Sequence, residues 1–591
     1  MPLNEEQASI IAEPNQNKLI CALPGSGKTY LSIRLADAIL TDPNTKLLMV
    51  TFTNAAAREM QDRATALLGK EKSRRLHTKT FAKIMIEQHK PLLNGRRLIM
   101  GGEYDNYILR VVKKLKIDVD NVSIVAQQIE EIGRDIHWQP KNDLASKAYI
   151  EIQNMMAMYS RIDLTTLAKE LVVGLQSGDI APLDYSHYIV DEFQDTDSVQ
   201  FDWLSAHNLP SKHFCVVGDD DQSIYYWRGA RGYSNMVAFQ RDFKATAYLM
   251  SKCYRCAPLI LGLAQQLIEH GADRIHKDMA SGVEERGRVS IRTFPSDYVS
   301  PFTAILESRT KVLGQALPPP TADNKDIEAY RYIVDQIQED YENWAILCRT
   351  NKHLDTLEYA LAERGIPAVR LGGKSIFDTP HAIGIAKLLV GVIFPLAHNQ
   401  LVDGLGWAGE DEVILQTMFY SLHGGGLDAQ GVNLKWLDIT TDLHSYCRKW
   451  QGKGGDVAST DEQLMDFFTV LDRHHGATDA QDIKYREAIA RTLKSMLLSM
   501  NGPVTERAKK LYKLATNSNK QKPSHKHPGK VVLCTLTGSK GLEWPKVFIM
   551  MINRQIIPSS KDDSEDNKDE ERRLLYVGMT RAERELGLHW H

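Results

Sequence analysis

Short apolar runs alternate with longer stretches of mixed polarity along this chain, a pattern that predicts an α/β protein. Residues 18–22 and 188–190 have the length and apolar character of buried strands, whereas residues 28–40 carry apolar side chains at helical spacing. Three further strand-like runs lie far downstream, at residues 344–348, 531–534 and 546–550. The predicted strands therefore fall into two groups that are distant in sequence.

A long, mostly helical stretch interrupts each group of strands. The predicted organisation is a first strand domain at 1–84 and 181–250 with a helical insert at 85–180, and a second strand domain at 251–380 and 529–591 with a helical insert at 381–528. The second insert ends in a polar, lysine-containing stretch at residues 517–530. A solvated linker is favoured there over a nucleic acid contact.

A glycine-rich turn joins the first predicted strand to the first predicted helix. Gly25 and Gly27 let backbone N–H groups turn inward toward phosphates at the positive end of the helix. Lys28 is placed to reach the β- and γ-phosphates of ATP, and Thr29 to ligate Mg²⁺. The predicted nucleotide loop comprises Ala22, Pro24, Gly25, Ser26, Gly27, Lys28, Thr29 and Tyr30.

An acidic pair, Asp191 and Glu192, ends the second predicted strand. Most acidic pairs are solvated surface groups, but this pair follows a buried run and precedes Phe-Gln-Asp. We expect Asp191 to help hold Mg²⁺ and Glu192 to orient or deprotonate the attacking water. Together with the glycine-rich turn, the pair predicts a site that hydrolyses ATP.

Several further motifs occur in order along the chain, at residues 51–58, 217–230, 253–255, 347–351, 535–544 and 570–582. On these motifs the chain resembles the superfamily 1 DNA helicases of the UvrD/Rep/PcrA type, over nearly all of both strand domains. The resemblance implies an α/β fold of two RecA-like P-loop motor domains, each interrupted by a mostly helical inserted domain.

The resemblance also implies roles for individual residues in the nucleotide site. Gln7 is expected to contact the adenine, Tyr254 to stack on it, and Glu543 to contact the nucleotide sugar. Arg255 and Arg581 suit stabilisation of charge on the γ-phosphate, where loss of such an arginine costs on the order of 10³-fold in rate or more. Gln222 is expected to sense the γ-phosphate and connect it to the DNA-binding surface.

Aromatic residues beside loops predict contacts with single-stranded DNA. The rings of Phe52, Tyr225 and Trp227 can stack on a base of any identity, at roughly 1–3 kcal/mol per base. A lone aromatic residue is more often part of a core, but the motif around Trp227 matches the relatives throughout. The resemblance adds further DNA contacts from Thr53, Asn54, Arg349 and Thr535.

The leading hypothesis is an ATP-dependent DNA helicase that translocates on single-stranded DNA and unwinds duplex at junctions, acting as a monomer. The resemblance implies movement from 3′ to 5′. Two alternatives stay open: a translocase that strips proteins from single strands, and an ATP-dependent DNA-binding switch. Only ten residues follow Arg581, so we expect the wedge hairpin of the relatives to be missing or shortened. Thr537 replaces their fifth-motif histidine, Tyr226 an arginine and Cys253 an asparagine.

Composition changes this picture little. The 591 residues allow about four domains. The net charge of −3 requires that DNA be bound by local basic clusters, and binding should weaken with salt. The seven scattered cysteines indicate reduced thiols and a cytoplasmic protein, and the Cys253, Cys256 pair has no second close pair that would complete a zinc site. The longest apolar stretch is too short to span a bilayer.

Overall fold

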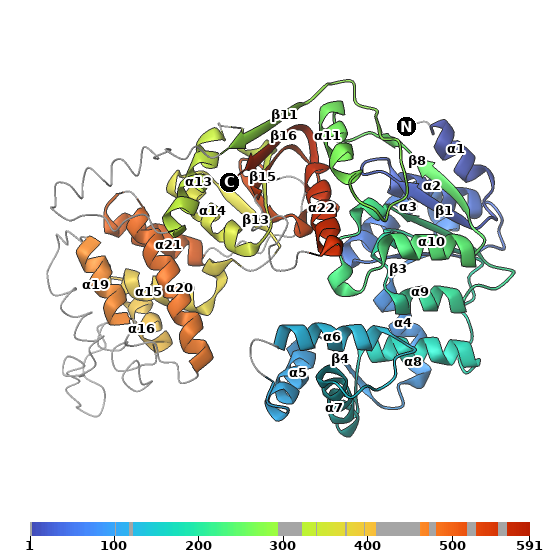
Figure 1. Cartoon of the computed structure of the whole chain (residues 1–591), viewed down its shortest axis with the longest axis horizontal. Helices are drawn as coiled ribbons and strands as arrows, with labels where there is room; N and C mark the ends of the chain where they lie inside the picture. The colour runs from blue at the N-terminus through green and yellow to red at the C-terminus, as the bar shows by residue number, and fades with distance from the viewer. Residues whose placement is uncertain are drawn as a thin grey trace. The chain divides into compact units, whose positions relative to one another are not determined.

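The computed structural model describes residues 3–100, 102–117, 122–293, 322–337, 340–372, 375–394, 396–408, 461–471, 480–500, 502–516, 527–552 and 564–590. They form two compact units, each built around its own sheet (Figure 1). The first unit comprises Met1–Arg288 and Pro558–Arg584, and the second comprises Val289–Ile557 and Glu585–His591. Each unit is described separately below.

The core of the first unit is a six-stranded sheet in which every neighbouring pair is parallel. The strands, in spatial order, are β3 (Leu76–Thr80), β2 (Leu47–Thr51), β6 (His187–Val190), β7 (His213–Gly218), β1 (Lys18–Ala22) and β8 (Thr246–Met250). Helices cover both faces, and therefore the central strands β1, β2 and β6 are buried along their whole length, whereas the edge strands β3 and β8 are partly exposed.

Alternate residues of β1 divide between two apolar clusters, one on each face of this sheet. Leu19 and Cys21 join the cluster that includes Phe81 and Trp203, whereas Ile20 joins the cluster on the other face. The helices that flank the sheet are α1 (Glu5–Ala12), α2 (Lys28–Ile39), α3 (Asn54–Ser73), α4 (Phe81–His89), α9 (Ser198–Ala206) and α10 (Gly232–Asp242). The strand at 18–22 and the helix that begins at Lys28 are both confirmed.

The stretch between β3 and β6 is mostly helical, as its sequence predicts (Figure 1). Its elements are η1 (Lys90–Leu92), β4 (Arg97–Ile99), α5 (Gly102–Lys114), α6 (Val122–Arg134), α7 (Leu144–Met158), β5 (Arg161–Asp163) and α8 (Leu164–Ser177). A separate small core holds α5, α6 and α7 together through Val111, Ile129 and Ile152. The short parallel pair of β4 and β5 was not predicted.

Segments from much later in the chain complete the first unit. They are β9 (Lys252–Cys253), α11 (Pro258–Ile268), β10 (Ala280–Ser281) and α22 (Glu565–Met579). Helix α22 packs against α11 and against η4 (Asp220–Gln222), which follows β7. This packing brings the sixth motif to the loops of the first sheet. Two further short turns in this region are η3 (Phe193–Asp195) and η5 (Tyr226–Arg228).

The second unit contains another six-stranded sheet. Its spatial order is β11 (Arg288–Thr293), β16 (Ala582–Trp590), β15 (Trp544–Ile552), β12 (Trp344–Cys348), β14 (Val531–Thr535) and β13 (Ala368–Leu371). The pairs of β12 with β14 and β15, and of β13 with β14, are parallel. Short turns and flanking helices are α13 (Ala322–Gln336), η6 (Tyr341–Asn343), α14 (Asn351–Glu363), η7 (Ile376–Asp378) and η9 (Thr537–Ser539).

A helical bundle interrupts the second sheet between β13 and β14. Its described helices are α15 (Pro380–Ile393), α16 (His398–Trp407), α19 (Asp461–Leu471), α20 (Ala480–Ser499) and α21 (Val504–Thr516). Helices α15 and α16 approach closely, since a Cβ on Gly391 would lie 2.4 Å from the Leu401 Cα. The predicted linker residues 517–526 and Cys447 lie outside the described residues. No helix in the described ranges is long and apolar enough to cross a membrane.

Candidate nucleotide-hydrolysis site

Four loops of the first unit gather at one edge of its sheet. Because β1, β2, β6 and β7 are parallel, their carboxyl ends share that edge, where open α/β sheets bind ligands. The loops are residues 23–27, 52–54, 191–197 and 219–231. They carry most of the candidate residues of the first unit.

The glycine-rich loop after β1 has the geometry of a phosphate cradle. Gly25 and Gly27 have φ values of 66° and 87°, which residues with side chains rarely adopt. Gly27 begins α2 without a side-chain cap, so the first N–H groups of the helix are left for an anion. A Cβ on Gly25 would lie only 2.4 Å from the Arg255 Cβ. Lys28 Nζ donates to the Ala22 carbonyl at 3.5 Å.

The other predicted members of the loop occupy the same turn. Pro24 and Ser26 are buried, and Ser26 Oγ donates to the Leu23 carbonyl at 2.7 Å. Thr29 and Tyr30 are half-buried in the first turn of α2. The loop is therefore held by its own hydrogen bonds, from Ser26 Oγ and the Ser26 N–H to the Leu23 carbonyl.

Gln7 and Tyr254 both lie against this loop. Gln7 is buried, and its Nε2 donates to the Ser26 carbonyl at 3.4 Å. The Tyr254 N–H donates to the Gly25 carbonyl at 2.9 Å, which holds the tyrosine beside the loop while its ring stays exposed. Asn4, which the sequence did not single out, caps α1 and donates from Nδ2 to the Tyr254 hydroxyl at 3.0 Å. The structure thus brings both predicted adenine contacts to one side of the loop.

Asp191 directly follows β6 and is 7% exposed. Its backbone N–H donates to the Val50 carbonyl, but its side-chain Oδ1 has no hydrogen-bond partner among the described residues. Burial raises the pKa of Asp191, as does the neighbouring Glu192, while Lys28 lowers it. A buried, unpartnered carboxylate oxygen beside a phosphate loop fits a divalent cation. Asp191 and Thr29 would hold Mg²⁺ there.

Glu192 adopts a left-handed backbone conformation, with φ 53°, which non-glycine residues rarely do. Its Oε2 accepts a hydrogen bond from Gln194 Nε2 at 2.6 Å. Gln194 in turn accepts from the Asp219 N–H, at 3.0 Å from its Oε1. The strained backbone and the bond from Gln194 fix the direction of the carboxylate, as expected for a group that positions water.

Arg581, Gln222 and Arg255 come together in the first unit. Arg581 is 1% exposed; its Nε donates to the Val577 carbonyl at 2.8 Å and its Nη2 to Gln222 Oε1 at 3.1 Å. Arg255 Nη1 donates to the Thr580 carbonyl at 3.5 Å. Burial and the positive charge of Arg255 lower the pKa of Arg581 to about 10, so it remains a cation at neutral pH. Both predicted arginines therefore belong to the compact unit that contains the phosphate loop.

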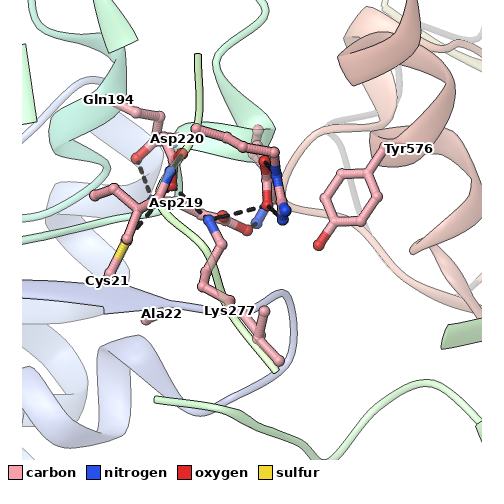
Figure 2. Close-up of polar contacts among 12 residues, drawn as sticks. Cys21, Ala22, Gln194, Asp219, Asp220, Lys277 and Tyr576 are labelled. Carbon is pink, nitrogen blue, oxygen red and sulfur yellow. Dashed lines mark hydrogen bonds and ion pairs between the residues drawn. The ribbon is translucent and has the colours of Figure 1, made fainter. Parts of the chain in front are cut away.

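Three consecutive aspartates after β7 form a buried acidic cluster with two cations that the sequence analysis missed. The carboxylates of Asp219, Asp220 and Asp221 all lie within hydrogen-bond distance of Lys277 Nζ. Figure 2 shows the Lys277 side chain beside Asp219 and Asp220. Arg274 pairs with both carboxylate oxygens of Asp221. The three carboxylates have metal-ligand spacing, but the ammonium group already occupies the position between them. We therefore do not assign a metal to the cluster.

The signal for these cations was present in the sequence. Three acidic residues that follow an apolar strand require buried positive charge, and the basic stretch from Arg274 to Lys277 is the partner. Gln194 lies in the same motif as Asp191, but the sequence predicted no role for it. Its contact is with the distant Asp219, whose N–H donates to Gln194 Oε1, and a local sequence pattern does not indicate such a contact.

The first unit also carries predicted DNA contacts. The rings of Tyr225 and Trp227 lie edge to face with their centroids 6.5 Å apart, and the Trp227 residue is half exposed. The Arg228 guanidinium lies 4.5 Å from the centroid of the Trp227 ring. The Arg573 guanidinium lies 5.6 Å from the centroid of the Tyr226 ring. A cation and exposed rings therefore adjoin one another on this loop, as base stacking and phosphate contact require.

The contacts predicted after β2 differ in exposure, since Phe52 is half-buried whereas Thr53 and Asn54 are exposed. Phe52 is half-buried and packs edge-on against Phe81, with centroids 5.5 Å apart. Thr53 uses its hydroxyl to cap α3 by accepting from the Ala56 N–H, and Asn54 is exposed in the first turn. These positions leave the DNA roles of the three predicted residues as predictions.

In the second unit, Arg349 and Thr535 follow adjacent strands. Cys348 pairs with Thr535 in the register of β12 and β14, so Arg349 and Thr535 lie at the same edge of the sheet. Thr535 Oγ1 accepts from the Gly538 N–H at 3.0 Å. Glu543, the predicted sugar contact, is half-buried just before β15.

The cysteine pair in and beside the motif at residues 253–255 makes structural contacts. Cys253 and Cys256 are both fully buried, and the Cys256 N–H donates to Cys253 Sγ at 3.3 Å. The Cys256 thiol donates to the Thr580 carbonyl at 3.5 Å. The pair ties the Arg255 loop to the end of α22.

Comparison with known proteins agrees with the motifs. Residues 3–244 match the model of the UvrD/REP helicase N-terminal domain, and residues 440–591 match that of the UvrD-like helicase C-terminal domain. The chain is 26% identical to DNA helicase II of Haemophilus influenzae, over 100% of this chain and 84% of that protein. It is 24% identical to the ATP-dependent DNA helicase PcrA of Leuconostoc citreum, over 99% of this chain and 81% of that protein.

A eukaryotic relative shows the same extent of similarity. The ATP-dependent DNA helicase srs2 of Schizosaccharomyces pombe is 25% identical over 98% of this chain and 71% of its own length. The two domain models together cover about two thirds of the chain, and the resemblance drawn from the motifs is confirmed. The chain belongs to the UvrD-like family of DNA helicases.

Proposed function

We propose that this UvrD-like helicase uses ATP hydrolysis to translocate along single-stranded DNA from 3′ to 5′ and to unwind duplex at single/double-strand junctions. The observation that carries the proposal is a chain of hydrogen bonds at the edge of the first sheet. It runs from Glu192 through Gln194, Asp219 and Gln222 to Arg581. Such a chain connects the predicted water-activating carboxylate to an arginine suited to the γ-phosphate.

The phosphate loop supports the assignment of the nucleotide site. We expect the backbone N–H groups at Gly25 and Gly27 to face the phosphates and Lys28 to neutralise their charge. Thr29 and Asp191 would hold Mg²⁺, which would neutralise the negative charge that develops on the phosphate groups. Gln7 and Tyr254 lie on the side of the loop where an adenine would rest.

The chemical step would use groups that are already oriented. Glu192 would take a proton from the attacking water, or orient it, because its carboxylate is held by Gln194. Arg581 and Arg255 would stabilise the negative charge that spreads over the transferred phosphoryl group. Gln222 contacts Arg581 and would register whether the γ-phosphate is present.

The position of the aromatic residues Tyr225 and Trp227 supports movement on DNA. Tyr225 and Trp227 follow Gln222 by only three and five residues. A shift of Gln222 would therefore move the loop that carries these two aromatic side chains. Stacking on any base suits a motor that must pass over all sequences. Arg349 and Thr535 would supply contacts from the second unit. The direction of movement rests on family membership alone.

The proposal extends to the arrangement of the whole protein. We place the two motor domains at 1–84 with 181–250 and at 251–380 with 529–591, and expect a monomer. The described cysteines are all free and buried, which supports work on DNA inside the cell.

The test is ATP hydrolysis measured without DNA, with single-stranded DNA and with blunt duplex, using Lys28→Ala as the inactive control. Strong stimulation by single strands alone is expected. A rate that ignores DNA would contradict the proposal and favour a nucleotide-dependent switch. Streptavidin bound to biotin at either end of an oligonucleotide then reports direction. Faster release from the 5′ end is expected, and faster release from the 3′ end would overturn the direction.

A further inference from the structure

The acidic cluster after β7, formed by Asp219, Asp220 and Asp221, is buried inside the first unit. The exposed fractions are 0% for Asp219, 1% for Asp220 and 0% for Asp221. Tyr576 of α22, which is wholly buried, covers the cluster on one side (Figure 2). Charged groups that are withdrawn from water to this extent persist only when they are paired and hydrogen-bonded. The pairing partners therefore decide where each carboxylate points.

Lys277 is the one group that touches all three carboxylates among the described residues. Its Nζ lies 2.9 Å from Asp219 Oδ1, 2.5 Å from Asp220 Oδ1 and 2.9 Å from Asp221 Oδ2. The ammonium group donates hydrogen bonds to Asp219 and Asp220 and forms an ion pair with Asp221. Lys277 is itself 1% exposed. Its position is therefore fixed from three directions.

The segment that carries Lys277 supplies separate anchors for the other two carboxylates. Arg274 donates to both oxygens of Asp221, at 2.9 and 2.8 Å. The Ile275 N–H donates to Asp220 Oδ2 at 2.6 Å. Asp219 receives no bond from this segment except the one from Lys277. Within this segment Asp219 therefore depends on Lys277 alone, whereas Asp220 and Asp221 each accept a further bond from it.

Asp219 is also the aspartate that adjoins the hydrolysis site. Its Oδ2 accepts from Gln222 Nε2 at 2.6 Å, and its N–H donates to Gln194 Oε1 at 3.0 Å. Gln222 leads to Arg581 and Gln194 leads to Glu192. With Oδ1 held by Lys277, only Oδ2 is left to orient the Gln222 amide.

We propose that Lys277 is a positioning residue for ATP hydrolysis, which holds Asp219 so that Gln222 and Gln194 keep Arg581 and Glu192 in a productive arrangement. The inference rests on the proposed ATPase function of this site. Without the ammonium group, Asp219 Oδ1 has no cation and competes with Oδ2 for the Gln222 amide, so that this amide turns away from Arg581. The hydrogen bonds that shape the nucleotide loop, from Ser26 Oγ to the Leu23 carbonyl and from Gln7 Nε2 to the Ser26 carbonyl, do not involve Lys277.

The test compares Lys277→Met with Arg274→Met. Both substitutions remove a buried cation from the cluster, but only Lys277 contacts Asp219. We expect Lys277→Met to lower kcat for DNA-stimulated ATP hydrolysis on the order of 10²-fold, as a small misplacement of catalytic groups does. KM for ATP and the affinity for a fluorescent ATP analogue should be nearly unchanged. Arg274→Met should retain most of kcat.

Two further variants separate positioning from folding. The double variant Lys277→Met/Asp220→Asn removes one cation and one anion, so it restores the charge balance of the cluster. Asp219 Oδ1 still lacks its cation in this variant. We expect its thermal midpoint to recover toward wild type and its kcat to stay low. Lys277→Arg keeps the cation and should recover part of kcat.

The outcomes are distinct. Recovery of kcat in the double variant, or equal kcat losses in Lys277→Met and Arg274→Met, would show a purely structural role and overturn the inference. Retained kcat in Lys277→Met would also overturn it. If the wild-type protein hydrolyses no ATP with single-stranded DNA, the proposed function itself fails, and the inference falls with it. An active wild type with a retained kcat in Lys277→Met refutes the inference alone.

Discussion

Replacement of Glu192 by glutamine tests the assignment of the water-activating group. The change removes a negative charge and almost no volume. Glu192 Oε2 accepts from Gln194 Nε2 at 2.6 Å, and the glutamine side-chain oxygen can accept the same bond. The chain from Gln194 to Asp219 should therefore persist, and the protein should fold with wild-type stability.

The expected magnitude follows from the loss of a positioned base. General base catalysis contributes roughly 10²- to 10⁴-fold, which corresponds to about 3–5 kcal/mol of transition-state stabilisation. Nucleotide binding should not weaken. Glu192 raises the pKa of the buried Asp191, so its removal lowers that pKa and favours the ionised form of Asp191 that holds a cation.

The assay measures kcat with saturating single-stranded DNA, and ATP affinity by titration of a fluorescent analogue. Glu131→Gln, an identical change on the exposed face of α6, is the matched control and should behave as wild type. Wild-type kcat in Glu192→Gln would remove Glu192 from the role of base. A loss of nucleotide affinity equal to the loss of kcat would assign it to binding instead.

Four further predictions concern DNA binding, the phosphate loop and stability. Trp227→Ala should weaken single-stranded DNA binding by roughly 1–3 kcal/mol, measured by fluorescence anisotropy, because the exposed ring is lost as a stacking surface. Gly25→Ala should lower kcat because the new Cβ, 2.4 Å from the Arg255 Cβ, must displace that arginine. Burial lowers the pKa of His207 to about 4, below the 6.5 of the unfolded chain. The unfolded state therefore binds the proton first as pH falls below 6.5, and the free energy of unfolding measured in urea should drop by about 2 kcal/mol at about pH 5 from this group. Gly391→Ala should destabilise the helical bundle by about 1–3 kcal/mol, seen as a lower thermal midpoint, because α16 backbone occupies the space of the new methyl group.

Each of these predictions has a control in the chain. Tyr159→Ala removes an exposed aromatic ring far from the sheet edge and should leave DNA affinity unchanged. Gly178→Ala also places alanine at a positive φ, 83° compared with 66° at Gly25, but the new Cβ meets nothing within 4 Å, so equal kcat losses would contradict the displacement of Arg255. Gly262→Ala also meets nothing and should not destabilise. His207→Gln should reduce the pH dependence, and an unchanged slope would contradict the assignment.

The sequence predicted those features that depend on local pattern. The strand at 18–22, the positive-φ glycines at 25 and 27 and the helix that begins at Lys28 all follow from one continuous stretch, where periodicity and backbone geometry agree. The helical character of the two inserts follows in the same way. What the pattern could not give was how many helices each insert forms, or the short β4 and β5 pair.

The contacts missed by the sequence analysis join residues that are far apart in the chain. Lys277 neutralises Asp219 from 58 positions away, and Asn4 reaches Tyr254 across 250 positions. Such pairs depend on how α11, α22 and the first sheet pack, which no local period encodes. Phe52 illustrates the converse, since its position after a strand predicts a loop aromatic while its ring packs against Phe81.

ATP-dependent strand displacement tests directly whether this helicase unwinds DNA from a 3′ tail. The substrates are matched duplexes that carry a 3′ or a 5′ single-stranded tail, with Lys28→Ala as the control. We expect displacement only from the 3′-tailed duplex, and none by Lys28→Ala. Displacement only from the 5′-tailed duplex, or from neither by a protein whose ATPase is active on single strands, would refute unwinding from a 3′ tail.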